Sequence, residues 1–258
     1  MSAAVVNIVI GLATSVIAGG SVWLWGRAKN ARVRRRQERF FGLAPGGTCL
    51  IVMNNKYNMP GSAHHNDVQA MIEIATLASG IGSAVSIESC NDFHGLNGDR
   101  TEFCVGGPAG GSNPRTGGHV AANLPGVTLR PYGPARPDSM AISVGGEEFR
   151  REPGSEEYAL VAKFTPPGST SPVIVICGQH SLANRAAIGY LKREYRQLSK
   201  ILRSVDRFCI VVRAASVGTY GHQAAELAGD VTAAAFQPRQ EPSAAPEAAG
   251  PAGSTAQA

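Results

Sequence analysis

The stretch Val173–Leu202, VIVICGQHSLANRAAIGYLKREYRQLSKIL, contains two regular elements in direct succession. Its first residues are almost wholly apolar and rich in Val and Ile, which is typical of a strand buried on both faces. From Asn184 onward the apolar residues recur at helical spacing and form one stripe: Ala187, Tyr190 or Leu191, Tyr195, Leu198, and Ile201 or Leu202. The stretch therefore predicts a strand followed by an amphipathic helix.

The same alternation extends on both sides of this unit. A helical pattern covers Asn66–Ser79, with Asn66 or Asp67 available as N-cap and Gly80 as the stop. Pro131–Glu157 carries turn residues and no helical period, which predicts a small β excursion. Further strand-like runs lie at Thr48–Asn55, Ala84–Ser89, Thr101–Gly107, Glu157–Pro166 and Arg207–Ser216. Because fully apolar strands need cover on both faces, we expect an α/β fold over residues 48–236, with a mostly parallel Rossmann-like sheet and helices on both faces.

The N-terminal segment has a different composition. Residues 2–26 carry no charge, and Trp23 and Trp25 stand at the end of this apolar run. This pattern predicts one transmembrane helix over residues 1–26, followed by a basic juxtamembrane segment over residues 27–47. The position of the positive charge predicts a single-pass inner-membrane protein with its N-terminus outside and its main domain cytoplasmic. A cleaved signal peptide is the alternative, although its positive charge would precede the apolar run.

The net charge is concentrated in one segment. The chain carries +5, and Arg27–Arg39 alone carries +6 from seven basic residues and Glu38, so that the rest carries about −1. An extended basic surface is therefore missing, and we expect no nucleic-acid partner. The bilayer is the expected partner of the basic segment, through membrane-surface residues Arg32, Arg34, Arg35 and Arg36. A solvated helix face without a partner is the alternative interpretation.

Two further features concern the redox compartment and the C-terminal end of the chain. The five cysteines have no metal-ligand spacing, and four of them lie in or beside apolar runs, which favours free thiols in a reducing compartment. Residues 237–258 are rich in Pro and Ala and lack aliphatic branched and aromatic residues, which predicts a disordered tail.

Polar and small residues gather where three of the expected strands end. In open α/β sheets ligands bind at the carboxyl ends of the strands, where glycines let backbone N–H groups approach. Amides and arginines at these ends would bind a phosphate or carboxylate, although the glycine-rich loop is neither a GxGxxG fingerprint nor a P-loop. Ordinary turns are the alternative. The candidate ligand-binding residues are Asn54, Asn55, Gly106, Gly107, Asn113, Arg115, Gln179, His180, Asn184 and Arg185.

Catalytic and metal signals are weak. His64 and His65, with Asp67 nearby, are residue types that bind metals, but adjacent histidines in one loop point in different directions and do not chelate the same ion. Since a third ligand is then missing, we expect no metal and no cofactor. Glu147 and Glu148 follow a glycine turn and are candidate acid/base residues, with a solvated hairpin end as the alternative.

Three segments, FCVGGPAGGSNPRT, YALVAKFTPPG and VIVICGQHSLANRAAIGYL, in this order resemble an uncharacterised group of prokaryotic Rossmann-like domains. Domains of this group are often joined to DNA-binding, transmembrane or surface-layer modules, which implies a sensory or binding role. The chain departs from the pattern by inserting Gly110 and Gly111 and by having Ala183–Arg185 where the group has Gly-Thr. The matching positions are Gly106, Gly107, Pro108, Asn113, Pro114, Thr116, Gly178, Ala186 and Ala187.

Together these patterns predict a membrane-anchored cytoplasmic protein for sensing or signalling that binds a small anionic or nucleotide-like ligand. The first alternative is an enzyme acting on a nucleoside or nucleotide, with Glu147 or Glu148 as acid/base and His180 assisting. The second alternative is a scaffold with no ligand, whose tail recruits partners.

Overall fold

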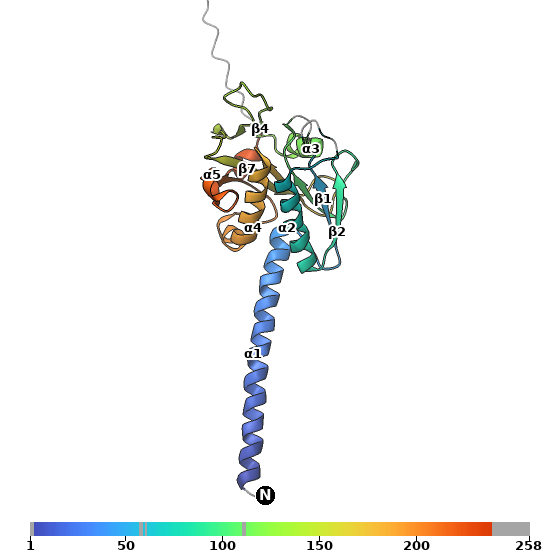
Figure 1. Ribbon diagram of the computed structural model, residues 1–258. Helices are drawn as coiled ribbons and strands as arrows, with labels where there is room; N and C mark the ends of the chain where they lie inside the picture. Colours follow the sequence, from blue (N-terminus) through green and yellow to red (C-terminus); the bar gives the residue numbers. More distant parts are fainter. Residues whose placement is uncertain (1–2, 57–58, 60, 110–111, 239–258) are drawn as a thin grey trace, which may run out of the picture.

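The computed structural model describes residues 3–56, 59, 61–109 and 112–238, with side chains described from Gly20 onward. A seven-stranded sheet forms the centre of the α/β unit, and the long helix α1 (Ala3–Phe41) projects from it (Figure 1). The other helices are α2 (His65–Ile81), α3 (Pro114–Asn123), α4 (Ser181–Ile201), α5 (Val217–Tyr220) and α6 (Thr232–Ala235).

The central sheet has the strand order β10-β9-β7-β8-β3-β1-β2. Its strands are β1 (Thr48–Met53), β2 (Ala84–Ser89), β3 (Thr101–Val105), β7 (Glu157–Phe164), β8 (Val173–Gly178), β9 (Phe208–Ala214) and β10 (Ala225–Asp230). A second sheet consists of three antiparallel strands, β4 (Val127–Leu129), β5 (Ile142–Val144) and β6 (Glu147–Phe149). Strands β5 and β6 lie within the expected β excursion, whereas β4 precedes it.

The prediction of a mostly parallel sheet is wrong, because the sheet is mixed. Strands β2, β1, β3 and β8 run parallel, whereas β7 is antiparallel to both β8 and β9, and β10 is antiparallel to β9. The segment 165–172 between β7 and β8 is too short for the crossover that a parallel pair requires. The error arises because a strand buried on both faces has the same apolar pattern whichever way its neighbours run.

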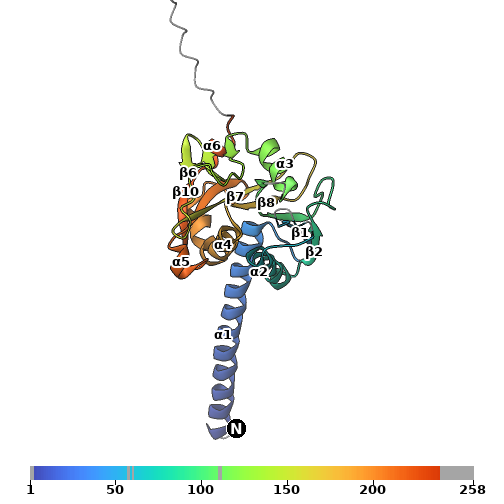
Figure 2. The same cartoon turned by 45° about the horizontal axis from the view of Figure 1, so that its top comes forward.

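Two hydrophobic cores cover the two faces of the sheet. One lies under α2, α4 and the end of α1, and the other lies under α3, the small sheet and α6. Figures 1 and 2 show α2 and α4 on the side from which α1 projects, and α3 on the opposite side. The second face is therefore covered largely by a small sheet, where helices were expected.

The end of α1 belongs to the folded unit. Phe40 and Phe41 are buried in the first core, and the Phe40 ring stacks on Phe208 at 5.5 Å between ring centroids. The Lys163 ammonium on β7 donates hydrogen bonds to the carbonyl oxygens of Arg39 and Phe40 at 2.8 and 3.0 Å. Because these carbonyls close the helix, Lys163 acts as a C-terminal cap from a buried strand. The folded unit therefore begins before Thr48.

The transmembrane helix predicted over residues 1–26 is not found. No helix in the part of the chain that the structure describes is long and apolar enough to cross a bilayer. The side chains described for α1 begin at Gly20, and the uncharged run ends at Gly26, before Arg27. This described run is shorter than the roughly 20 apolar residues that a membrane span needs. Residues 1–19 of the prediction lie outside the described side chains. The structure therefore does not support the predicted single-pass inner-membrane localisation with the main domain cytoplasmic.

The tail predicted to be disordered lies, from residue 239 onward, outside the described residues.

Candidate functional site

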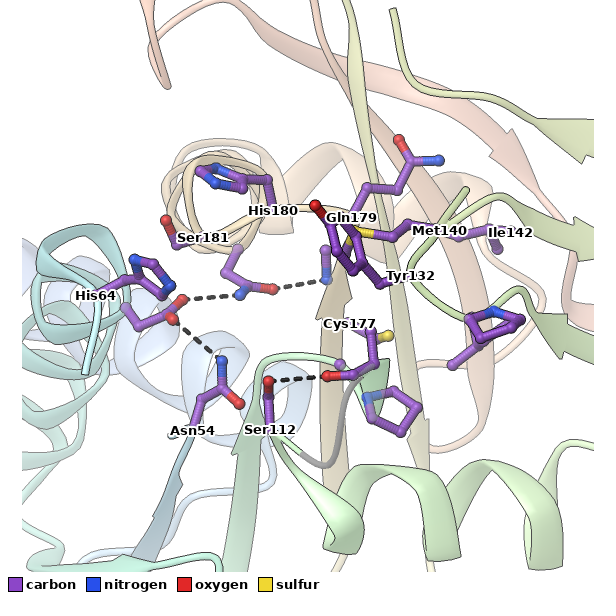
Figure 3. A pocket seen from close by; sticks show the side chains of 18 of the residues that line it. Asn54, His64, Ser112, Tyr132, Met140, Ile142, Cys177, Gln179, His180 and Ser181 are labelled. Atoms are coloured by element: carbon purple, nitrogen blue, oxygen red, sulfur yellow. Dashed lines mark hydrogen bonds between the residues drawn. The ribbon is translucent and has the colours of Figure 1, made fainter. Parts of the chain in front are cut away.

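The carboxyl ends of β1, β3 and β8 meet at one edge of the sheet, although they are far apart in the sequence. A cavity of about 460 Å³ lies there, a volume within the usual range of small-molecule sites (Figure 3). Six of the ten candidate ligand-binding residues line it: Asn54, Asn55, Gly107, Gln179, His180 and Asn184.

One wall of the cavity is a chain of buried hydrogen bonds. Asp67, in the first turn of α2, accepts from the Asn54 side-chain amide at 3.2 Å and from the Asn184 side-chain amide at 2.8 Å. The side-chain carbonyl oxygen of Asn184 in turn accepts a hydrogen bond from the Gly178 backbone N–H at 2.6 Å. Asn54 directly follows β1, and the other two side chains come from α2 and α4, so these bonds hold the strand end and both helices in fixed positions.

Two glycines leave room for this wall. Gly106 has a φ of +98°, and a Cβ there would overlap the Asn54 side chain. A Cβ on Gly178 would lie 2.7 Å from the backbone nitrogen of Asn184. Gly106 therefore does not line the cavity, but the absence of a Cβ leaves the space that the Asn54 side chain occupies.

Two buried oxygens at this wall have no partner among the described residues. They are the side-chain carbonyl oxygens of Asn54 and Asn55, whose residues are 8% and 6% exposed. The Asn55 amide donates to the Cys90 sulfur at 3.2 Å, which fixes the orientation of the group. Because a buried carbonyl without a hydrogen bond costs about 1–3 kcal/mol, these oxygens favour a ligand that donates hydrogen bonds.

The facing wall is largely apolar, with Arg130 as its charged residue, and comes from the small sheet and its loop. Figure 3 shows Tyr132, Met140 and Ile142 on the side opposite Asn54 and His64. Met140 has a φ of +61°, an uncommon conformation for a residue with a side chain, and such strain is often found at functional sites. The sequence gives no signal for this wall, since its residues come from the small sheet and its loop and do not follow the strands whose ends form the rest of the cavity.

Asn113, Arg115 and Arg185 lie outside the cavity lining. Asn113 caps α3: its carbonyl oxygen accepts from the Thr116 N–H at 3.1 Å and its amide donates to the Val105 carbonyl at 3.0 Å. Arg115 pairs with Glu102, and Arg185 approaches Glu73 at 3.9 Å. Arg115 donates two hydrogen bonds to its carboxylate partner, whereas the buried Nε of Arg185 has no hydrogen-bond partner among the described residues.

Gln179 lines the cavity but is engaged in structural bonds. Its carbonyl oxygen accepts from the Tyr158 N–H at 2.9 Å, and its amide donates to the Phe149 carbonyl at 2.8 Å. Since Tyr158 lies on β7 and Phe149 on β6, Gln179 connects the two sheets.

A separate buried cluster surrounds Glu102 on β3. Its carboxylate accepts hydrogen bonds from Arg115 (2.6 Å), His119 (3.1 Å) and Cys104 (2.9 Å). Burial by itself raises the pKa of Glu102, but the bonds from Arg115, His119 and Cys104 outweigh it and lower the pKa to about 2. Glu102, Cys104 and His119 place possible metal-ligand atoms within 4.8 Å of one another. The Arg115 cation already occupies the carboxylate, which disfavours a metal ion.

The cavity contains one thiol and two imidazole groups, whereas the candidate acid/base residues lie outside its lining. Burial raises the pKa of Cys177 in the cavity to about 12, so its thiol is not a ready nucleophile. The rings of His64 and His180 lie 5.9 Å apart at the cavity. Glu147 and Glu148 do not line it, and Glu148 pairs with Arg150.

The predicted membrane-surface arginines lie on different faces of α1. Arg34 pairs with Glu38 at 3.1 Å and donates to the Ile81 carbonyl. Arg35 lies beside the loop that follows α1. Arg32 and Arg36 share a groove with α4.

No family model, curated protein or solved structure matches the chain. The resemblance to the Rossmann-like group therefore stays a prediction.

Proposed function

We propose that this protein binds a small, neutral, nucleoside-like molecule in the cavity at the ends of β1, β3 and β8. The observation that carries the proposal is the pairing of the unpartnered Asn54 and Asn55 oxygens with a facing apolar wall. Hydroxyl groups of a sugar supply the hydrogen-bond donors, and a planar ring packs against Tyr132 and Met140.

The charges around the cavity favour a ligand without a phosphate group. Among its described lining residues, Arg130 is the only Lys or Arg, and it pairs with Asp138 at 3.5 Å. Asp67 contributes a carboxylate on the opposite wall and would repel an anion. The predicted anionic or nucleotide-like ligand thus has less support than a neutral, nucleoside-like one.

Calorimetric titration of the full chain with adenosine, uridine and their monophosphates tests the proposal. Tyr132 is 51% exposed, so Tyr132→Ala spares the core and should weaken nucleoside binding by roughly 5- to 100-fold, the usual effect of losing one stacked aromatic ring. Tyr220→Ala is the matched control, because Tyr220 is 62% exposed and lies outside the cavity lining.

Two results would contradict the proposal. The first is no heat of binding with any of these compounds. The second is a monophosphate that binds at least tenfold more tightly than its nucleoside, which would show that a cation recognises the phosphate.

A further inference from the structure

A basic groove lies where α1 leaves the α/β unit, beside α4. Its volume is about 390 Å³. Four cations line it, three from α1 and one from α4, together with three uncharged residues: Lys29, Arg32, Arg36, Arg196, Trp25, Ala28 and Val33. On α1, Trp25, Lys29, Arg32 and Arg36 are spaced to lie on one face of the helix.

The four cations of this groove lack carboxylate partners. Among the described residues, none of the four forms an ion pair, and no acidic side chain lines the groove. On other faces of α1, Arg34 pairs with Glu38 and Arg39 with Asp206. Arg35 also lies outside the groove and forms no ion pair among the described residues. Four like charges in one groove repel one another unless an anion lies between them.

Apolar side chains continue from the groove along α1. Val22, Trp23, Leu24 and Trp25 are each at least 59% exposed, and four successive residues cover all faces of a helix. A helix that is apolar on all faces is normally covered on all of them. The partner must therefore offer an apolar environment next to an anionic one.

We propose that this groove binds the phosphate group of an anionic phospholipid at a bilayer surface. The guanidinium groups of Arg32, Arg36 and Arg196 donate hydrogen bonds to the phosphate oxygens. The indole rings of Trp23 and Trp25 lie at the level of the headgroups, which is the depth that tryptophan prefers. A nucleic acid supplies the charge but has no apolar layer for Val22–Trp25, so the bilayer fits both features.

The chain contains its own probe for this contact, because its two tryptophans are Trp23 and Trp25. The full chain is titrated with vesicles of phosphatidylcholine alone and of equal parts phosphatidylcholine and phosphatidylglycerol. We expect a shift of tryptophan emission to shorter wavelength, tighter binding to the anionic vesicles, and stronger quenching by bromines placed near the headgroup than by bromines deep in the acyl chains.

Two matched variants separate the groove from general charge. Arg32→Gln with Arg36→Gln and Arg196→Gln should weaken binding to anionic vesicles about 100-fold, at about fivefold per cation. Arg35→Gln with Arg39→Gln and Lys200→Gln removes the same charge from the same two helices outside the groove, and should leave binding within about fivefold.

The inference is overturned if both variants weaken binding equally, or if phosphatidylglycerol makes no difference. It is also overturned if inorganic phosphate displaces the vesicles, which would indicate a site for free phosphate. The same emission shift with duplex DNA, or on raising the protein concentration without vesicles, would identify a nucleic acid or a second copy as the partner.

Discussion

The buried carboxylate of Glu102 should make the stability of the protein depend on pH in a defined window. Glu102 is fully buried, and Arg115, whose side chain is 13% exposed, donates two hydrogen bonds to it. Replacing Glu102 with Gln keeps the size of the side chain, removes the charge and leaves the Arg115 cation without its partner.

The size of the effect follows from the pKa of Glu102. That pKa is lowered from 4.5 to about 2 in the folded chain, and each unit corresponds to about 1.4 kcal/mol, so ionisation adds about 3 kcal/mol to the free energy of unfolding at pH 7. Because the folded pKa is the lower one, this stabilisation is present above pH 4.5 and is lost as the pH falls toward 2.

Urea unfolding of the wild type and of Glu102→Gln at a series of pH values measures this loss. We expect the variant to be about 3–5 kcal/mol less stable at pH 7, and this difference to shrink to about 1 kcal/mol near pH 2. Glu148→Gln is the control, because the exposed Glu148–Arg150 pair should contribute less than about 1 kcal/mol. A difference between wild type and Glu102→Gln that stays constant from pH 7 to pH 3 would refute the reasoning.

Two other substitutions test the supports of the fold. Gly106→Ala should lower the free energy of unfolding by about 2–4 kcal/mol, since its φ is positive and a Cβ would overlap Asn54, whereas Gly118→Ala, which has open space inside α3, should be neutral or stabilising by about 1 kcal/mol. Urea unfolding measures both, and equal losses would contradict the role of Gly106. Burial lowers the pKa of Lys163 from 10.5 to about 8, so the folded chain releases this proton at a lower pH than the unfolded chain does. The free energy of unfolding of the wild type, relative to that of Lys163→Met, should therefore rise between pH 8 and 10.5. Unfolding curves across this range check the sign, and a falling difference would show that the carbonyl bonds keep the amine charged.

Several elements could be predicted from the sequence because local patterns determine them. The apolar run Val173–Cys177 forms a strand and the stripe from Ala187 to Leu198 forms a helix, since both patterns depend on neighbouring residues only. The small residues at the strand ends likewise indicated where the chain turns, and Gly106 and Gly178 lie at such turns. Asn54 and Asn184 were found among the candidates for the same reason.

The tertiary structure alone decided the direction of β7 and the composition of the site. A buried strand has no polar face that would reveal the direction of its neighbours, so the mixed sheet could not be read from Glu157–Phe164. Arg115 is held outside the cavity by its pairing with Glu102, which lies near the start of β3, whereas the cavity lies at the end of that strand, and no local pattern records this pairing. In the same way, Tyr132 reaches the cavity from the small sheet and Arg196 reaches α1 from α4, since contacts between distant segments depend on how the layers pack.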